Sequence, residues 1–296
     1  MNELRERRLY LGLTAGVFAV SLAAVFIRLA GEAPPLAIAA YRMSLGAAAM
    51  SLFAFGRQAT GGAPPLRGLA RRDLPLIGVS ALCLALHFWT WIVSLEHTSV
   101  ASSVVLVTAS PLITAVASRA LFGEAIHTRT LVGIGVGLAG GVLLAAGDAG
   151  DGSELFGDAM AFLGAIAVVG YMLAGRRLRT RLPATTYNLS VYTVAAVLLW
   201  ALALGFGAQL EGFRVDTYLW LAVTAIVPQA IGHSLLNWSL GHVTATAVTV
   251  AVMAEPVIAT IVAIPVLGEQ PPLTSVAGGA LVLAGIFVAM RKAPGG

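Results

Sequence analysis

Long apolar runs are the feature that most limits how this chain can fold. Ten of them follow one another, and each is close to the roughly 20 residues that a helix needs to cross the hydrocarbon core of a bilayer. Hydrophobic residues make up 58% of the 296 positions and charged residues only 11%, a composition unlike that of soluble domains. Because a helix satisfies its own backbone hydrogen bonds in lipid, the sequence predicts an all-α membrane protein of ten transmembrane helices in a lipid bilayer.

Short segments rich in Pro, Gly and charge separate these runs. In chain order, the predicted spans are Leu9–Ile27, Leu36–Phe55, Leu74–Ser94, Ala101–Leu121, Leu131–Ala146, Phe156–Gly175, Thr186–Gly207, Tyr218–Leu240, Ala245–Leu267 and Leu273–Met290.

Arginines gather in alternate connections. They are dense before the first span, at 57–72 and at 176–181, whereas the opposite connections contain only Arg28 and Arg214 and carry mainly acidic residues. Since Lys and Arg concentrate on the cytoplasmic side, we expect a multi-pass protein of the cell inner (cytoplasmic) membrane with both termini in the cytoplasm. The arginines flank apolar runs and form no basic surface, so nucleic acid is not an expected partner.

An internal repeat is the most specific signal in the chain. A shift of 145 residues, which takes His97 to His242, also aligns Pro111 with Pro256 and the pair Gly123-Glu124 with Gly268-Glu269. Half of ten helices is an odd number, so the second copy enters the membrane in the opposite direction and the repeat is inverted. We predict a first five-helix repeat at 1–147, an outer connecting loop at 148–155 and a second five-helix repeat at 156–296.

Two segments carry a resemblance to a known family. The run "HTSVASSVVLVTASPLITAVASRALFGEAIHTRTLVGIGVGLAGGVLL" and its partner "GHVTATAVTVAVMAEPVIATIVAIPVLGEQPPLTSVAGGALVLAGIFV" resemble the two EamA domains of the drug/metabolite transporter superfamily. Arg42, in the second predicted span, also matches the arginine that this family carries there.

The resemblance implies a function as well as a fold. It implies a secondary transporter that exports small organic metabolites by alternating access, with no cofactor and no metal. The overall pattern is most similar to YddG-type exporters of aromatic amino acids, which makes aromatic or neutral amino acids the expected substrates. Cationic drugs, sugars and nucleoside-like solutes stay open as alternatives, because family members share these motifs while carrying different solutes.

Polar and aromatic side chains inside the spans are the candidates for substrate binding. Gln229, His233 and Asn237 recur every four residues and share one helix face, where they could bind the carboxylate and amine of an amino acid. Hydrogen bonds between helices are the alternative explanation for this stripe. His87 and Trp91 share a face of the third span and Tyr171 could extend this aromatic wall, although lone aromatics also anchor helices at the membrane interface.

Charged residues and prolines in the spans indicate the mechanism. Glu255 stands where the first repeat has Ser110; it could exchange protons and couple transport to a proton gradient, or form a structural ion pair with Arg42. Arg42 lies too deep to reach water easily, so a carboxylate partner is expected from Glu255 or from the substrate. Pro111 and Pro256 each remove a backbone hydrogen bond and are expected as hinges, with static kinks as the alternative.

The remaining features concern assembly and rival functions. Gly133, Gly137 and Gly141 form small-xxx-small spacings that predict helix packing, within the chain or in a homodimer. The segment "GHSLLN" contains Gly-x-Ser, but His233 and Ser234 point about 100° apart on one helix, so they cannot act as a base and nucleophile. No metalloprotease motif or channel filter loop is recognisable, and we expect a carrier that is not an enzyme.

Overall fold

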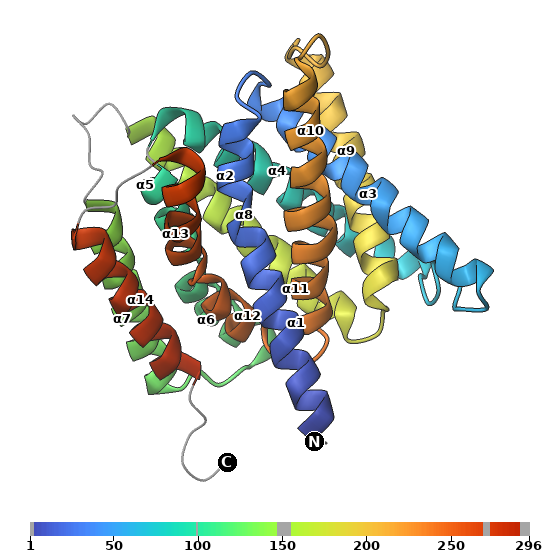
Figure 1. Ribbon diagram of the computed structural model, residues 1–296. Coiled ribbons are helices and arrows are strands. Elements are labelled where there is room, and N and C mark those ends of the chain that lie inside the picture. The colour runs from blue at the N-terminus through green and yellow to red at the C-terminus, as the bar shows by residue number, and fades with distance from the viewer. Residues whose placement is uncertain (1–2, 99, 147–154, 269–272, 291–296) are drawn as a thin grey trace.

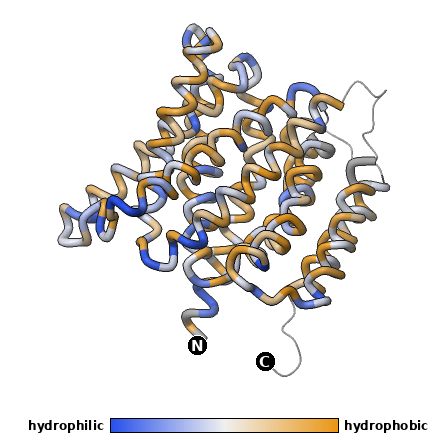
Figure 2. Tube along the Cα trace, turned by 180° about the vertical axis from the view of Figure 1, so that it is seen from behind, coloured by the Kyte–Doolittle hydropathy of each residue, from blue (hydrophilic) through white to orange (hydrophobic). Residues whose placement is uncertain are grey.

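The helices form one bundle, shown in Figure 1. The computed structural model describes residues 3–98, 100–146, 155–268 and 273–290, and every regular element in those ranges is a helix. Figure 2 shows hydrophobic residues along the helices and hydrophilic residues gathered mainly at their connections. Lipid-facing helices require this distribution, and the predicted all-α membrane fold is confirmed.

The first half of the chain contains α1 (Glu3–Ser21), α2 (Ala23–Leu29), α3 (Pro35–Ala59), the short 3₁₀ helix η1 (Arg71–Asp73), α4 (Leu74–His97), α5 (Val100–Val107), α6 (Ser110–Phe122) and α7 (Thr128–Ala146). The second half contains α8 (Leu155–Arg179), α9 (Ala184–Gly205), α10 (Val215–Thr224), the π-helix η2 (Ala225–His233), α11 (Ser234–Ser239), α12 (Ala245–Val252), α13 (Glu255–Leu267) and α14 (Leu273–Met290).

Several of these elements join into longer membrane spans. Within the described ranges, eight helices are long and apolar enough to cross a membrane, and two further apolar helices, at Thr128–Leu143 and Val276–Met290, are shorter. The total of ten spans therefore stays a prediction. The eight longer spans are Glu6–Leu29, Pro35–Ala59, Arg71–His97, Ser103–Phe122, Leu155–Arg179, Ala184–Gly205, Val215–Ser239 and Ala245–Leu267.

The two halves run through the bundle in opposite directions. Helix α1 begins and α14 ends at one end of the bundle, which we call the terminal end; the opposite end is the far end (Figure 1). Helix α6 runs toward the terminal end and stops at Gly123, whereas α13 runs toward the far end and stops at Gly268. Both glycines have a left-handed backbone, with φ of 66° and 71°, a helix ending that glycine adopts without strain.

Some predicted features cannot be compared with the structure. Glu269, the partner of Glu124 in the repeat, and residues 148–154 of the predicted connecting loop lie outside the described residues. The proposed boundaries of the two repeats stay predictions.

Helices α7 and α14 lie side by side at one edge of the bundle (Figure 1). A Cβ atom at Gly133 would lie 2.5 Å from the Ala289 nitrogen, and one at Gly140 would lie 2.6 Å from the Val282 nitrogen. Small residues therefore let the two backbones touch. Of the three glycines in the predicted spacing, Gly133 and Gly137 lie at this contact, whereas Gly141 faces Val105 of α5. This face is occupied within the chain, so a homodimer through these helices would have to use their outer faces.

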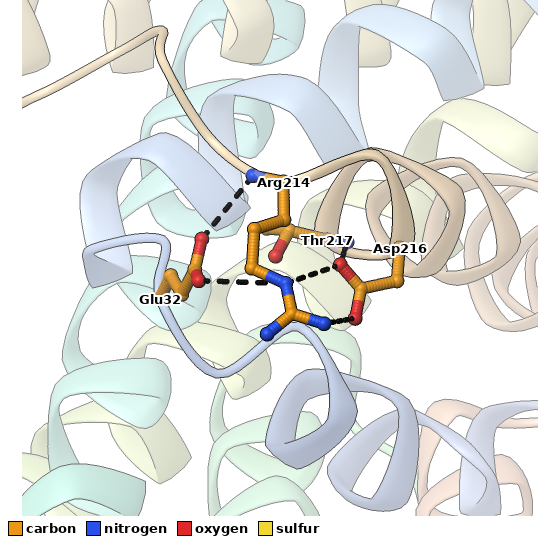
Figure 3. Close-up of polar contacts among 4 residues, drawn as sticks. All are labelled: Glu32, Arg214, Asp216 and Thr217. Atoms are coloured by element: carbon orange, nitrogen blue, oxygen red, sulfur yellow. Dashed lines mark hydrogen bonds and ion pairs between the residues drawn. The ribbon is translucent and has the colours of Figure 1, made fainter.

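An exposed charge cluster joins the two halves at the far end, shown in Figure 3. The Arg214 guanidinium donates two hydrogen bonds to Asp216, of 3.1 and 2.8 Å, and lies 3.8 Å from the Glu32 carboxylate. The Arg214 backbone N–H also donates to Glu32 over 3.2 Å. The loop between α2 and α3 is thereby tied to the loop between α9 and α10.

A second contact joins the halves at the terminal end. Arg181, after α8, forms an ion pair with Asp73, which is fully buried ahead of α4. The Thr186 hydroxyl, in the first turn of α9, donates to the Arg67 carbonyl in the loop before η1 over 3.0 Å and adds a neutral hydrogen bond nearby. The predicted inverted repeat relates the loop of Glu32 to that of Arg181, and the loop of Arg214 to that of Asp73. The acidic and basic partners are therefore exchanged between the two ends.

Candidate functional site

A small cavity lies among the helices, next to the interruptions between α5 and α6 and between α12 and α13. Its volume is about 40 Å³, which holds a few water molecules. A larger solute therefore needs the surrounding helices to move apart. Its walls come from both halves: Val20, Ala23, Arg42, His87, Trp91, Val107, Ser110, Val168, Met172, His233, Leu236, Thr249, Val252 and Glu255.

Arg42, on α3, is the main cation of this cavity. Its side chain is buried, with 1% of the residue exposed, and Nε donates a 3.0 Å hydrogen bond to the Gln229 side-chain oxygen. The guanidinium carbon lies 4.0 Å from the centre of the Phe88 ring, a cation–π contact that fixes the plane of the group. Nη1 is buried without a hydrogen-bond partner. This cavity-lining residue thus keeps one charged donor without an acceptor among the described residues.

The π-helix η2 brings Gln229 to Arg42. Pro228 lies inside η2 and cannot donate a backbone hydrogen bond, and π-helical turns are common at functional sites. On the facing helix, a Cβ atom at Gly46 would lie 2.9 Å from Gln229 Cγ. The absent side chain at Gly46 therefore lets Gln229 pass over α3 and reach Arg42 one turn earlier.

Glu255 is the carboxylate of the cavity. It begins α13, directly after the break at Met253 and Ala254, and only 9% of the residue is exposed. Within the ranges that the structure describes, no donor forms a hydrogen bond or ion pair with it. The structural ion pair with Arg42 that the sequence suggested is not formed in this conformation; the two opposite charges line one cavity without touching.

His87, Trp91 and His233 also face the cavity, as the sequence predicted for candidate binding residues. His87 Nδ1 lies 2.9 Å from the Gly164 carbonyl, which can only accept, so the proton sits on Nδ1. The His87 and Trp91 rings are stacked nearly parallel, with centroids 5.9 Å apart. Trp91 Nε1 and His233 Nδ1 are buried without hydrogen-bond partners. Their role in binding stays a prediction.

Tyr171 and Asn237 are placed differently from the other candidates. Asn237 Nδ2 donates to the Tyr171 hydroxyl over 2.5 Å and to the Asn188 side-chain oxygen over 2.7 Å. All three residues are buried, and none of them lines the cavity. The structure therefore favours the alternative that the sequence left open for this part of the stripe, hydrogen bonding between helices. Gln229 does not line the cavity, but its side-chain oxygen accepts the hydrogen bond from Arg42 Nε and positions that side chain.

The two prolines expected as hinges stand in equivalent places. The spans that contain them end and restart: α5 stops at Val107 and α6 begins at Ser110, while α12 stops at Val252 and α13 begins at Glu255. Pro111 and Pro256 each occupy the first turn of the second segment, where a proline costs little because no helical donor is needed. The cavity lies at both breaks, since Ser110 and Glu255 line it.

Sequence reasoning missed part of the site. Ser110, Thr249 and Met172 line the cavity without having been singled out, and Gly46 was not recognised as a close approach. A small polar residue beside a mid-span proline is the signal that could have identified Ser110.

The serine of "GHSLLN" has no catalytic geometry. The Ser234 hydroxyl lies 3.2 Å from the Tyr192 hydroxyl and 3.4 Å from the Met50 sulfur, and it forms no hydrogen bond with His233. The described ranges hold no group of three or more His, Cys, Asp or Glu side chains placed to bind a metal ion.

These features define a multi-pass membrane protein with a mainly apolar cavity that holds two oppositely charged residues between two inverted halves. The model of the EamA-like transporter family matches residues 7–146 and 155–291, and the chain belongs to this family. Membership of this family makes it a membrane transporter. The predicted resemblance is confirmed at the level of the family.

Individual relatives agree with this assignment. The chain is 27% identical over 231 residues to an uncharacterized transporter of Archaeoglobus fulgidus, covering 77% of this chain and 80% of the relative. It is 27% identical over 232 residues to a probable terminal-alkyne amino-acid exporter of Streptantibioticus cattleyicolor, covering 76% and 75%. One solved crystal structure superimposes with a TM-score of 0.80 at 20% identity over 96% of this chain and 97% of that chain, which shows the same fold.

Proposed function

We propose that this protein exports amino acids with apolar side chains, aromatic or aliphatic, from the cytoplasm by alternating access. The observation that carries the proposal is the cavity: it combines a buried cation, Arg42, and a buried anion, Glu255, with apolar walls at the breaks of two spans. The likeness to a probable amino-acid exporter supports the same class of solute.

Three structural features support alternating access. The halves are inverted, so equivalent motions of each could open opposite ends of the bundle. Spans broken at Pro111 and Pro256 allow one half of a helix to move while the other half stays packed. Loop contacts tie the halves at both ends, through Arg214 and through Arg181, so opening either end requires that contact to separate.

The proposed orientation places the terminal end in the cytoplasm of a bacterial-type inner membrane. The arginines at the start of α1, between α3 and α4 and at the end of α8 support this orientation, since the cytoplasmic side collects positive charge. Solute would enter near α1, α6 and α12, where a pocket of about 320 Å³ lies. It would leave at the end marked by the Glu32 and Arg214 cluster.

Transport assays with purified protein in proteoliposomes test the proposal. A panel of radiolabelled amino acids, organic cations, a sugar and a nucleoside is offered, and saturable, competable uptake is measured against protein-free vesicles. We expect uptake of phenylalanine or leucine that competes with other apolar amino acids. Failure of every amino acid in vesicles that contain folded protein would overturn the proposal.

An organic cation is the second candidate solute. The observation that favours it is that Glu255 has no hydrogen-bond or ion-pair partner among the described residues and shares its cavity with Trp91, because aromatic faces and carboxylates both attract cations. Uptake of cations without competition from amino acids would establish this alternative.

The same vesicles test whether Glu255 couples transport to protons. If it does, Glu255→Gln abolishes the effect of an imposed pH gradient on the uptake rate. Unchanged uptake and unchanged pH dependence in the variant would remove the coupling hypothesis.

A further inference from the structure

A site that binds only an organic cation or only an organic anion needs one charged residue, whereas this cavity is lined by two residues of opposite charge, Arg42 and Glu255. Resting on the proposed function, we infer that the site recognises the zwitterionic α-carbon group of a free amino acid, with the carboxylate on Arg42 and the ammonium on Glu255.

Arg42 is prepared for a carboxylate. Its Nε is already bonded to Gln229 over 3.0 Å and its plane rests on Phe88, so the guanidinium is held in one orientation before a solute arrives. Its Nη1 is buried and unpartnered, and a buried charged donor without an acceptor is unfavourable. A carboxylate oxygen at Nη1 would complete the group with a charge-assisted hydrogen bond.

A second cavity-lining residue has an unmet donor. Trp91 Nε1 is buried without an acceptor among the described residues, and an indole N–H can only donate. Two residues of one cavity wall that each have an unmet donor call for an anionic or carbonyl oxygen rather than another donor.

Glu255 is prepared for the opposite charge. Its carboxylate is buried, lines the cavity and has no hydrogen-bond or ion-pair partner within the described ranges. Arg42 and Glu255 share this space without meeting, so each stays incompletely compensated. A cation alone would leave Arg42 unpaired, and an anion alone would leave Glu255 unpaired. A zwitterion compensates both.

The other residues that line the cavity determine which amino-acid side chains can bind. The other lining residues are mostly aliphatic, including Val20, Val107, Val168, Met172, Leu236 and Val252. An apolar side chain gains from burial against such a surface, whereas a charged or amide side chain would lose its hydration there. The ligand class is therefore an α-amino acid with an apolar side chain and with both its amino and carboxyl groups free.

Binding of matched analogues to purified, detergent-solubilised protein tests the inference. Phenethylamine lacks the carboxylate of L-phenylalanine, and 3-phenylpropionate lacks its ammonium. Both are competed against radiolabelled L-phenylalanine; L-leucine with 3-methylbutylamine and 4-methylpentanoate forms a second series. We expect each analogue to bind at least about thirtyfold more weakly than its parent amino acid, because each leaves one buried charge unpaired.

The Glu255→Gln variant tests recognition of the ligand's ammonium group separately from recognition of its carboxylate. The variant should weaken phenylalanine binding about thirtyfold and change 3-phenylpropionate binding by less than about threefold, since that analogue makes no contact with the carboxylate. Glu211→Gln, which changes an exposed carboxylate in the loop after α9, should leave all three ligands unchanged.

The outcomes are distinguishable from failure of the proposed function. If no amino acid is transported, the proposed function is overturned. If amino acids are transported but amine and acid analogues compete as well as the parent, or if Glu255→Gln weakens phenylalanine and 3-phenylpropionate equally, only the zwitterion site is overturned. Transport restricted to polar amino acids would contradict the apolar side-chain pocket. The analogue comparison in the wild type needs no variant, so a misfolded Glu255→Gln leaves the test intact.

Discussion

The contact between α7 and α14 offers a sharp test, because two glycines on α7 differ only in what they face. A Cβ atom at Gly133 would lie 2.5 Å from the Ala289 nitrogen, 2.6 Å from the Ala289 Cβ and 2.6 Å from the Gly285 oxygen. A Cβ atom at Gly135 would meet nothing within 4 Å. The same substitution therefore forces two helices apart at one position and adds an exposed methyl group at the other.

The expected energies follow from this difference. Replacing glycine by alanine favours the helix by up to about 1 kcal/mol at either position, so this contribution cancels in the comparison. The steric cost belongs to Gly133→Ala alone. Because two of its three nearest atoms are backbone atoms, no side-chain rotation relieves the clash, and we expect about 1–3 kcal/mol of destabilisation relative to Gly135→Ala.

Unfolding in mixed detergent micelles with rising sodium dodecyl sulfate measures the difference. Gly133→Ala should unfold at a lower midpoint than the wild type, and Gly135→Ala at an equal or higher one. No residue of α7 or α14 lines the cavity, so transport per folded molecule should be retained in both variants. Equal midpoints would refute the view that these helices touch through glycine.

Three further predictions concern the site, the loop contacts and the topology. Gly46→Ala should displace Gln229 from Arg42 and weaken solute binding, while Gly56→Ala on the same helix, with nothing within 4 Å, should bind normally in the competition assay. Arg181→Ala removes the ion-pair partner of the fully buried Asp73 and should lower the free energy of unfolding by about 3 kcal/mol. Arg214→Ala breaks an exposed ion pair and should lower it by less than about 1 kcal/mol. Equal losses would contradict the argument from burial. In a Cys83→Ser background, Thr60→Cys should react with a membrane-impermeant maleimide only from the cytoplasm and Gln209→Cys only from outside, and labelling of both from one side would overturn the inverted arrangement.

The sequence predicted the spans well because lipid imposes a strong local rule. The predicted run Ala245–Leu267 agrees with the span in the structure, and Leu9–Ile27 lies inside Glu6–Leu29. The helices extend past the apolar runs because the backbone continues its hydrogen bonding into the polar ends. Paired Gly and Pro positions indicated the repeat for a similar reason: Gly123 and Gly268 both end helices with a positive φ.

The arrangement of the site was harder to predict, because it depends on contacts between distant segments. Arg42 and Gln229 are 187 positions apart, and the π-helix that joins them depends on how η2 packs on α3 at Gly46. The four-residue spacing placed Gln229, His233 and Asn237 on one face, yet only His233 reaches the cavity wall. A face of a helix can meet different neighbours along its length, and the sequence alone does not contain that information.

The proposed hinges and the proposed binding residues are distributed differently over the repeat. The breaks at Pro111 and Pro256 correspond between the halves, whereas Ser110 and Glu255 occupy equivalent positions with different chemistry. Arg42 comes from the first half and Glu255 from the second, and they line the cavity without touching. A zwitterion that binds both would therefore connect the two halves and neutralise a charge on each. In the proposed alternating access, these halves would move relative to each other, so the solute would bind the two parts whose separation changes during transport. A ligand lacking either charge would bind one half without linking it to the other.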